Sequence, residues 1–210
     1  MTIEAVIFDL GGVILDIDYV ATVRAFEELF GSEGRLSYSQ QRQSSIFDEL
    51  ETGRVSPDAF YATLARELGR PLDPAAIDLA WNAMLGEIHP PRIDFIRKLG
   101  RSKRLFLLSN TNIIHKTAVA DALQRPMGGV PFDSLFEAAY YSHEIGLRKP
   151  DVEVFRFVLD RHGLKPQTTL FIDDSLANIE GAKKTGLQVH HLRQELLDDE
   201  HLRHLLEDEA

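Results

Sequence analysis

The sequence contains no cysteine among its 210 residues. This absence excludes a disulfide framework, a thiolate metal site and a cysteine nucleophile. No apolar run approaches the roughly 18 residues that a membrane-spanning helix requires. The first residues, Met1–Glu4, show neither the basic nor the apolar region of a signal peptide. We therefore expect a cytoplasmic protein that does not enter a membrane.

Positive charge is also scarce, with 23 Lys and Arg against 33 Asp and Glu and a net charge of −10. Nucleic-acid binding depends on basic surface, so we expect no nucleic-acid partner. Much of the acidic excess is local, because residues 195–210 hold seven acids and one base. We expect these acids to form the solvated face of a C-terminal helix whose leucines pack inward. The remaining composition is that of a globular protein large enough to bury a core.

Three short apolar runs, Ala5–Phe8, Leu105–Leu108 and Leu170–Ile172, are rich in strand-forming residues and predict buried strands. Helical patterns lie between these runs. Strands that alternate with helices predict an α/β fold with a parallel sheet and right-handed crossovers. The two weaker strand candidates and the three helical patterns lie at 138–141, 188–192, 91–99, 152–159 and 175–185.

The segment 16–87 differs from the rest because it contains no convincing strand. Asp18 can begin one helix, and Ser56-Pro57 and Asp73-Pro74 carry the cap-then-proline signal for two more. This helical block interrupts the α/β pattern just after the first strand. The sequence therefore predicts an all-helical subdomain at 16–87, inserted into a core formed by 1–15 and 88–210.

Polar side chains follow each predicted strong strand. In open parallel sheets, ligands bind beyond the carboxyl ends of the strands, so these side chains should converge on one crevice. Clustered carboxylates repel one another unless a cation lies among them, and oxygen ligands favour Mg²⁺. Mg²⁺, a lysine and a hydroxyl together suit a phosphoryl group. The residues concerned are Asp9, Ser109, Asn110, Lys149, Asp173 and Asp174.

Four segments stand in order along nearly the whole chain: Phe8–Val13, Leu108–Asn112, Gly146–Asp151 and Phe171–Ser175. They resemble the four motifs of the haloacid dehalogenase-like (HAD) hydrolase superfamily. The first motif is also similar to that of small sugar-phosphate phosphatases of the α-glucose-1-phosphate phosphatase type. The resemblance implies a Rossmann-like core with the segment 16–87 as its cap. It also implies a Mg²⁺-dependent phosphomonoester hydrolase that acts on a small phosphorylated metabolite, with sugar phosphates favoured, and works as a monomer or homodimer.

The resemblance also implies a role for each matching residue. Asp9 is expected to be the nucleophile that forms an aspartyl-phosphate. Mg²⁺ is expected to bind Asp9, the backbone carbonyl of Gly11 and Asp174. Asp173 is expected to bind the metal directly or through water. Asn178 is expected to contact the metal ligands rather than the metal itself. The phosphate is expected to contact Ser109, Asn110 and Lys149, and Lys149 and Ser109 are counted with Asp9 as catalytic residues.

Gly11 departs from the usual pattern of the superfamily, in which a second aspartate two residues after the nucleophile protonates the leaving alcohol. A positioned general acid contributes about 10²–10⁴-fold to a rate. Its absence leaves three possibilities: a substitute acid, a better leaving group such as the anomeric oxygen of a sugar 1-phosphate, or a slow or inactive protein. We favour the second and expect sugar 1-phosphates to be preferred over 6-phosphates.

Three other functions compete with a phosphatase. One is a catalytically weak or inactive binding protein of the same fold, which Gly11 keeps open. A haloacid dehalogenase needs no metal and so does not need the pair Asp173-Asp174. A receiver-type signalling domain carries its acid pair on the first strand, whereas the pair here comes last.

Two interpretations are open for the position of several further residues. The turn Glu51–Arg54 could reach the substrate or be solvated, and Arg148 could contact substrate or lie on the surface. Trp81 is expected in the core of the helical subdomain rather than under a sugar ring. A metal site formed by the histidines is not expected. These histidines are His190, His191, His201 and His204.

Overall fold

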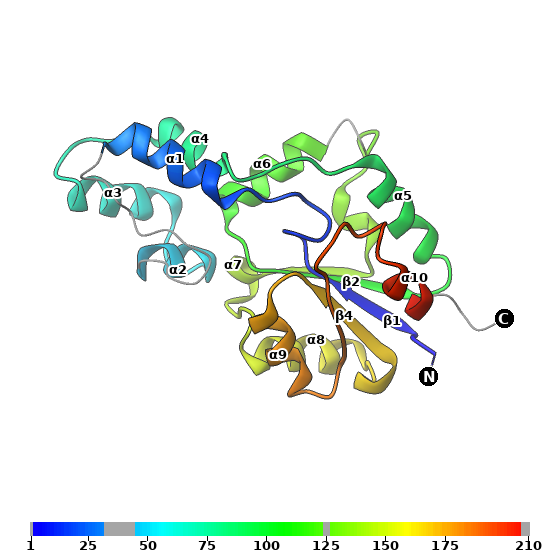
Figure 1. Ribbon diagram of the computed structural model, residues 1–210. Coiled ribbons are helices and arrows are strands. Elements are labelled where there is room, and N and C mark those ends of the chain that lie inside the picture. Colours follow the sequence, from blue (N-terminus) through cyan, green and yellow to red (C-terminus); the bar gives the residue numbers. More distant parts are fainter. Residues whose placement is uncertain (1, 32–44, 124–126, 207–210) are drawn as a thin grey trace.

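The computed structural model describes residues 2–31, 45–123 and 127–206 and contains a five-stranded parallel sheet (Figure 1). The strand order is β3-β2-β1-β4-β5, so the first strand in the sequence lies at the centre. All five predicted strands are confirmed, including the two weaker candidates. The strands are β1 (Ala5–Phe8), β2 (Arg104–Ser109), β3 (Ala138–Tyr141), β4 (Thr169–Asp173) and β5 (Gln188–His191).

Helices cover both faces of this sheet, which confirms the predicted α/β fold with a Rossmann-like arrangement (Figure 1). One face carries α5 (Pro90–Leu99), α6 (Ile113–Leu123) and α10 (Glu200–Leu206). The other face carries α8 (Val152–His162) and α9 (Leu176–Lys183). The remaining short elements are α7 (Ser142–Ile145), η1 (Phe132–Leu135) and η2 (Pro166–Thr168).

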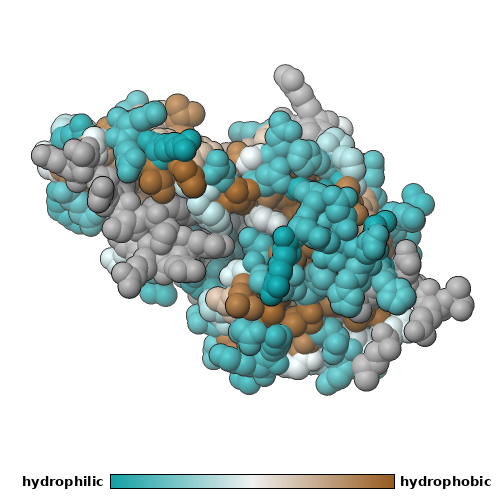
Figure 2. Space-filling view, viewed as in Figure 1, coloured by the Kyte–Doolittle hydropathy of each residue, from teal (hydrophilic) through white to brown (hydrophobic). Residues whose placement is uncertain are grey.

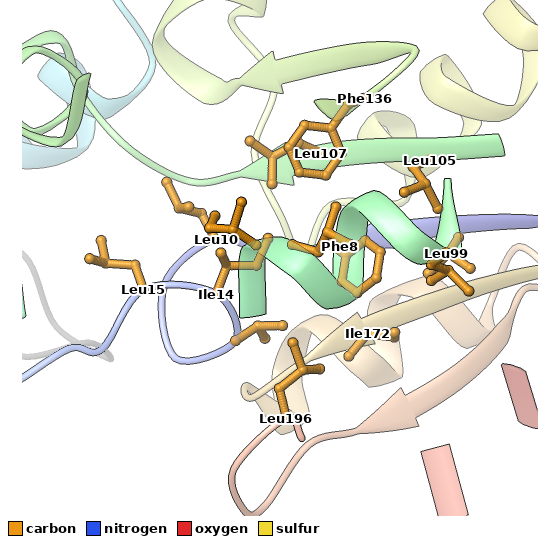
Figure 3. Close-up of a cluster of buried hydrophobic side chains, with 14 of the residues drawn as sticks. Phe8, Leu10, Ile14, Leu15, Leu99, Leu105, Leu107, Phe136, Ile172 and Leu196 are labelled. Carbon is orange, nitrogen blue, oxygen red and sulfur yellow. The ribbon is translucent and has the colours of Figure 1, made fainter. Parts of the chain in front are cut away.

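The alternation of side chains along the strands divides the core into two layers. Phe8, Leu107 and Ile172 point to the layer beneath α5, where they pack with Leu99 and Leu196 (Figure 3). The intervening strand residues point to the layer beneath α8 and α9. Because both faces are buried, the strands are continuously apolar rather than alternating.

Within its described residues, the segment between β1 and α5 forms four helices that project from the sheet as a separate lobe (Figure 1). Asp18, Ser56 and Asp73 cap three of them through side-chain hydrogen bonds, as their sequence signals predict. Trp81 is fully buried and stacks on Phe60 at a ring distance of 4.8 Å, so its predicted place in the helical core is confirmed. The helices are α1 (Tyr19–Phe30), α2 (Ser45–Glu51), α3 (Pro57–Glu67) and α4 (Pro74–Asn82).

Two antiparallel segments connect the helical lobe to the sheet. The backbone N–H of Asp16 donates to Glu87 at 3.0 Å, Gly86 donates to Asp16 at 2.8 Å, and Asp18 donates to Met84 at 2.9 Å. A side chain at Gly86 would collide with Asp16, since its Cβ would lie 2.8 Å from Asp16 Cβ. The entry and exit of the inserted helices therefore lie side by side. The residue boundaries of the two units stay a prediction.

The chain after β5 returns to the sheet through buried leucines. Leu202 and Leu206 of α10 and Leu196 before it are buried against the core, as expected, whereas Asp199 of the acidic stretch is buried as well. The acids at 207–209 lie outside the described residues. His190 pairs with Asp199 at 2.7 Å, and its ring lies 5.7 Å from that of His201 in a tilted arrangement. Within the described ranges, no helix combines the length and apolar character needed to cross a membrane.

Candidate active site

A cavity of about 620 Å³ lies at the carboxyl ends of the central strands, between the sheet and the helical lobe. The face seen in Figure 2 is mainly hydrophilic over the sheet domain, with hydrophobic residues confined to smaller areas. The cavity wall brings together residues from both units. The residues predicted for the site that line it are Asp9, Gly11, Ser109, Asn110, Lys149, Asp174 and Asn178.

Lys149 lies between two carboxylates at the end of the sheet. Its Nζ is 2.7 Å from Asp9 Oδ1 and 2.7 Å from Asp173 Oδ2, and its side chain is completely buried. Burial works against the charge of Lys149, but the two carboxylates outweigh it and raise the pKa of the ammonium group. A fixed positive charge therefore lies directly beside the Asp9 carboxylate.

The two adjacent acids at the end of β4 have different surroundings. Both oxygens of Asp173 accept from Asn178 Nδ2 at 3.0 Å, and Oδ1 also accepts from the backbone of Ser175 at 2.8 Å. With Lys149 added, Asp173 is held from several directions and is fully buried. Among the residues that the structure describes, no side chain donates a hydrogen bond to the Asp174 carboxylate, and Asp174 lines the cavity. The geometry makes Asp174 the acid that is open to an incoming ligand.

The three carboxylates have the chemistry of a site for a hard cation. One oxygen from each of Asp9, Asp173 and Asp174 lies within 4.8 Å of the others. Burial and the neighbouring acids raise the pKa of Asp9 well above its ordinary value, in spite of Lys149. Burial, followed by the charge of Asp173, raises the pKa of Asp174. One lysine thus leaves negative charge uncompensated, and an all-oxygen donor set of this kind fits Mg²⁺.

The loop after β1 approaches Asp174 so closely that it requires glycine. Gly12 has a φ of 71°, and a Cβ there would lie 2.3 Å from Asp174 Oδ2. The loop is closed by hydrogen bonds from Gly12 and Ile14 N–H groups to Leu15 and Leu10 carbonyls. The Gly11-Gly12 pair therefore allows the backbone near Gly11 to lie beside the acidic cluster.

The polar side chains of the motif after β2 make different contacts. Asn110 donates from Nδ2 to the Lys149 carbonyl at 2.8 Å and accepts from the Lys149 N–H at 2.9 Å. Asn112 Oδ1 accepts from the first turn of α6, at Ile114 and His115. Ser109 is buried at the end of β2 and lines the cavity. The side chain of Asn110 therefore holds the Lys149 backbone, a role that its position after a strand did not reveal.

The loop that carries Lys149 is also fixed from the other side. A Cβ at Gly181, in α9, would lie 2.2 Å from the carbonyl oxygen of Pro150. The Lys149–Pro150 peptide bond is cis. The close approach of α9 to this loop depends on the missing side chain at Gly181, a contact between residues far apart in the sequence.

The helical lobe contacts the sheet domain at the cavity through α2 and the turn that follows it. Arg148 pairs with Asp48 and with Glu51, whose Oε2 lies 3.2 Å from Nη2. Gly53 packs onto the backbone of His143, where a Cβ would lie 2.1 Å from the carbonyl oxygen. Glu51 and Arg148 form part of the cavity wall. The structure therefore supports a position at the cavity, rather than on the open surface, for Arg148 and for the turn that begins at Glu51.

Residues 3–186 match the family model described as haloacid dehalogenase-like hydrolase. The chain belongs to the haloacid dehalogenase-like hydrolases. The order of the motifs and the parallel sheet with Asp9 at the end of its central strand agree with this membership.

The similarity to curated proteins and to solved structures covers nearly the whole of this chain. A D-ribitol-5-phosphate phosphatase of Bacteroides thetaiotaomicron is 33% identical over 187 residues, covering 89% of this chain and 90% of that protein. A HAD family enzyme of the same organism, solved with magnesium and inorganic phosphate, has a TM-score of 0.84 at 29% identity and covers 95% and 98% of the two chains. A HAD-like family hydrolase from Porphyromonas gingivalis has a TM-score of 0.87 at 31% identity, with 99% and 100% covered.

These findings confirm the prediction of a HAD-like enzyme of the phosphatase type that uses Mg²⁺. They also confirm the resemblance on which that prediction rests. They do not test the role of each site residue, so these assignments stay predictions. The structure brings the predicted residues together at one edge of the sheet.

Proposed function

We propose that this HAD hydrolase removes phosphate from a small phosphorylated sugar or polyol through an aspartyl-phosphate on Asp9. The observation that carries the proposal is the position of Asp9, which ends the central strand beside Lys149 and opens to the cavity. The proposal on the substrate draws on the relative named for D-ribitol 5-phosphate. A cavity of about 620 Å³ is ample for a molecule of that size.

The proposed metal ligands are Asp9, Asp174 and the carbonyl of Gly11, with Asp173 acting directly or through water. Mg²⁺ at this position would neutralise phosphate oxygens and the acids that surround them. Asn178 and the Ser175 backbone hold Asp173 in place behind the metal. Without a cation, three acids and one lysine would repel an anionic phosphate.

In the first step, a carboxylate oxygen of Asp9 attacks phosphorus while the bond from phosphorus to the substrate oxygen breaks. The leaving alcohol takes up a proton. In the second step, water attacks the phosphorus of the aspartyl-phosphate, and inorganic phosphate leaves with the Asp9 carboxylate restored. Lys149 keeps a positive charge beside the nucleophile in both steps, and Ser109 can donate its hydroxyl to a phosphate oxygen.

Gly11 supplies no acid for the leaving alcohol. A Cβ at Gly11 would lie 3.2 Å from Ile17 Cγ1, so an acidic side chain at this position would contact the apolar side chain of Ile17. This contact supports the view that the proton comes from water or from the substrate. We propose that sugar 1-phosphates, whose anomeric oxygen needs less protonation, are hydrolysed faster than 6-phosphates.

The cytoplasmic location rests on the absence of cysteine and stays a prediction, as does the choice between monomer and homodimer. We propose a phosphorylated small molecule as the partner of this site, and we propose no nucleic-acid or membrane partner.

Phosphate release from a panel of sugar 1-phosphates, sugar 6-phosphates and D-ribitol 5-phosphate tests the function. Each reaction is run with Mg²⁺ and with a chelator, for the wild-type protein, Asp9→Asn and Asp94→Asn. Asp94 is exposed on α5 and serves as the matched control. We expect Mg²⁺-dependent release that Asp9→Asn abolishes and Asp94→Asn retains.

The other outcomes separate the competing functions. No release from any phosphate ester, together with retained substrate binding, would favour the inactive binding protein that Gly11 leaves open. Metal-independent release of halide from a 2-haloacid would favour a dehalogenase. Equal or reversed preference between 1-phosphates and 6-phosphates would overturn only the leaving-group argument.

A further inference from the structure

We propose that His115 is a specificity-determining residue whose Nε2 accepts a hydrogen bond from a hydroxyl group of the substrate. The inference rests on the proposed function and names the group that recognises the part of the substrate beyond the phosphate. His115 belongs to the sheet domain but contacts the helical lobe, and it lines the cavity that contains Asp9.

The orientation of the His115 ring is fixed by its neighbours. Nδ1 lies 2.7 Å from Asn82 Oδ1 at the end of α4. An amide oxygen only accepts hydrogen bonds, so Nδ1 carries the proton and donates it. The backbone N–H of His115 donates to Asn112 Oδ1 at 3.0 Å, which anchors the start of α6. Trp81 packs against the ring in a T-shaped contact, with the ring centroids 4.9 Å apart.

The tautomer that Asn82 selects leaves Nε2 as a hydrogen-bond acceptor. This atom has no hydrogen-bond partner among the described residues, although the side chain is only 7% exposed. Burial lowers the pKa of His115 to about 3, so the ring is neutral at physiological pH and keeps the Nε2 lone pair. A neutral acceptor in a cavity wall is suited to a hydroxyl donor and offers nothing to a phosphate oxygen.

This arrangement distinguishes His115 from the residues around the acidic cluster. Lys149 and Ser109 present donors, which suit phosphate oxygens, whereas His115 presents an acceptor on the side of the cavity next to the helical lobe. A polyol or sugar phosphate carries both kinds of group, with hydroxyl donors at one end and phosphate acceptors at the other. The cavity therefore offers complementary partners to the two ends of one small molecule.

The test compares two substrates with the same carbon count and the same kind of leaving group. D-ribitol 5-phosphate carries hydroxyl groups along its chain, whereas n-pentyl phosphate carries none. The variants are His115→Phe, which keeps a ring against Trp81 without an acceptor, and His115→Gln, which keeps an amide oxygen. His162→Gln is the control, because His162 bonds Tyr140 on the sheet face covered by α8, away from the cavity.

We expect His115→Phe to lower the kcat/KM ratio of ribitol phosphate to pentyl phosphate by about tenfold, the effect of one lost hydrogen bond at a buried site. The change should appear mainly in KM, and His115→Gln should recover part of the ratio. His162→Gln should leave it unchanged. Equal losses on both substrates would assign His115 a purely structural role, and an unchanged ratio in His115→Phe would also overturn the proposal.

A binding measurement separates this inference from the proposed function. Asp9→Asn protein with Mg²⁺ is titrated calorimetrically with D-ribitol 5-phosphate and with inorganic phosphate, with and without His115→Phe. Selective weakening of ribitol phosphate binding supports the role of His115 even if the wild-type protein hydrolyses no ester. If ribitol phosphate binds no more tightly than inorganic phosphate in the Asp9→Asn protein, hydroxyl recognition by His115 is wrong.

Discussion

The ammonium nitrogen of Lys149 lies 2.7 Å from a carboxylate oxygen of Asp9, and the side chain of Lys149 is completely inaccessible to solvent. A cation at this distance compensates part of the cost of burying the carboxylate. It also favours the ionised form of Asp9, which is the form that attacks phosphorus. The pair therefore links the stability of the sheet edge to its chemistry.

Replacing Lys149 by Met should abolish phosphate release and destabilise the protein. The substitution leaves Asp9 and Asp173 buried without their shared cation, and breaking a buried ion pair costs about 3–5 kcal/mol. Urea denaturation measures the free energy of unfolding, and Lys183→Met on the exposed side of α9 is the control. A fully stable Lys149→Met protein would show that the carboxylates do not depend on this cation.

Replacing Asn110 by Ala should reduce activity by displacing Lys149 rather than by removing a phosphate ligand. Two hydrogen bonds to the Lys149 backbone are lost, which costs about 1–3 kcal/mol for groups left unpaired in a buried site. Asn110→Asp keeps the acceptor for the Lys149 N–H and should be less harmful to folding. The comparison combines kcat with urea denaturation. Loss of phosphate affinity with full stability in Asn110→Ala would favour direct phosphate binding instead.

Replacing Gly181 by Ala should lower both stability and kcat, although Gly181 is in a helix that contains no predicted nucleophile. The new Cβ would meet the Pro150 carbonyl at 2.2 Å, and forced overpacking of this kind costs about 1–3 kcal/mol. The loop that carries Lys149 must then shift. Lys184→Ala, also near the end of α9, is the control for helix propensity. Wild-type kcat in Gly181→Ala would mean that α9 moves and the loop does not.

The stability of the metal-free protein should fall as the pH rises above about 4, the ordinary range of carboxyl groups. Burial and neighbouring acids raise the pKa of Asp9 and of Asp174. The folded protein therefore holds protons that the unfolded chain releases, and that stabilising difference is lost as pH rises through the folded-state pKa values. Mg²⁺ should bind more tightly to the deprotonated acids and stabilise the protein more at pH 8 than at pH 5.

Asp174→Asn separates this effect from other titrations, including those of the histidines. The variant should be more stable than the wild type without metal at pH 8 and should gain little from Mg²⁺. Urea denaturation in the presence of a chelator or of excess Mg²⁺, at both pH values, gives the comparison. A stabilisation by Mg²⁺ that is the same in Asp174→Asn and in the wild type would exclude Asp174 as a ligand.

Gly11→Asp should reveal what limits the chemical step. An acid at position 11 would meet Ile17 Cγ1 at 3.2 Å, so the double variant Gly11→Asp with Ile17→Ala gives it room. If protonation of the leaving alcohol limits the rate, the double variant should raise kcat on sugar 6-phosphates by about tenfold or more. The increase in kcat on 1-phosphates should be smaller. Ile17→Ala alone is the control. No gain on either class would place the limiting step elsewhere.

The fold was predictable because its signals are local. Apolar runs predicted the strands, and Asp18, Ser56 and Asp73 predicted where helices begin. Short sequence motifs also predicted which acids meet, because parallel strands carry their ends to one edge of the sheet.

The contacts that hold the site together were not predictable, since they join residues far apart in the sequence. Asn110 bonds the backbone of Lys149, and Gly181 makes room for Pro150, but neither residue differs locally from an ordinary turn or helix residue. His115 follows the same rule, because its tautomer is set by Asn82, in a different unit of the fold.

The junction at Asp16 and Glu87 has a consequence for the evolution of this protein. The inserted helices leave and rejoin the sheet domain at adjacent points, which are joined by backbone hydrogen bonds and by the close approach of Gly86 to Asp16. The insertion can therefore vary in length and sequence without altering the register of β1 and β2. A new helical lobe on the same sheet would keep the machinery that handles phosphate and change the molecule that carries it, so that reactivity and selectivity can evolve separately.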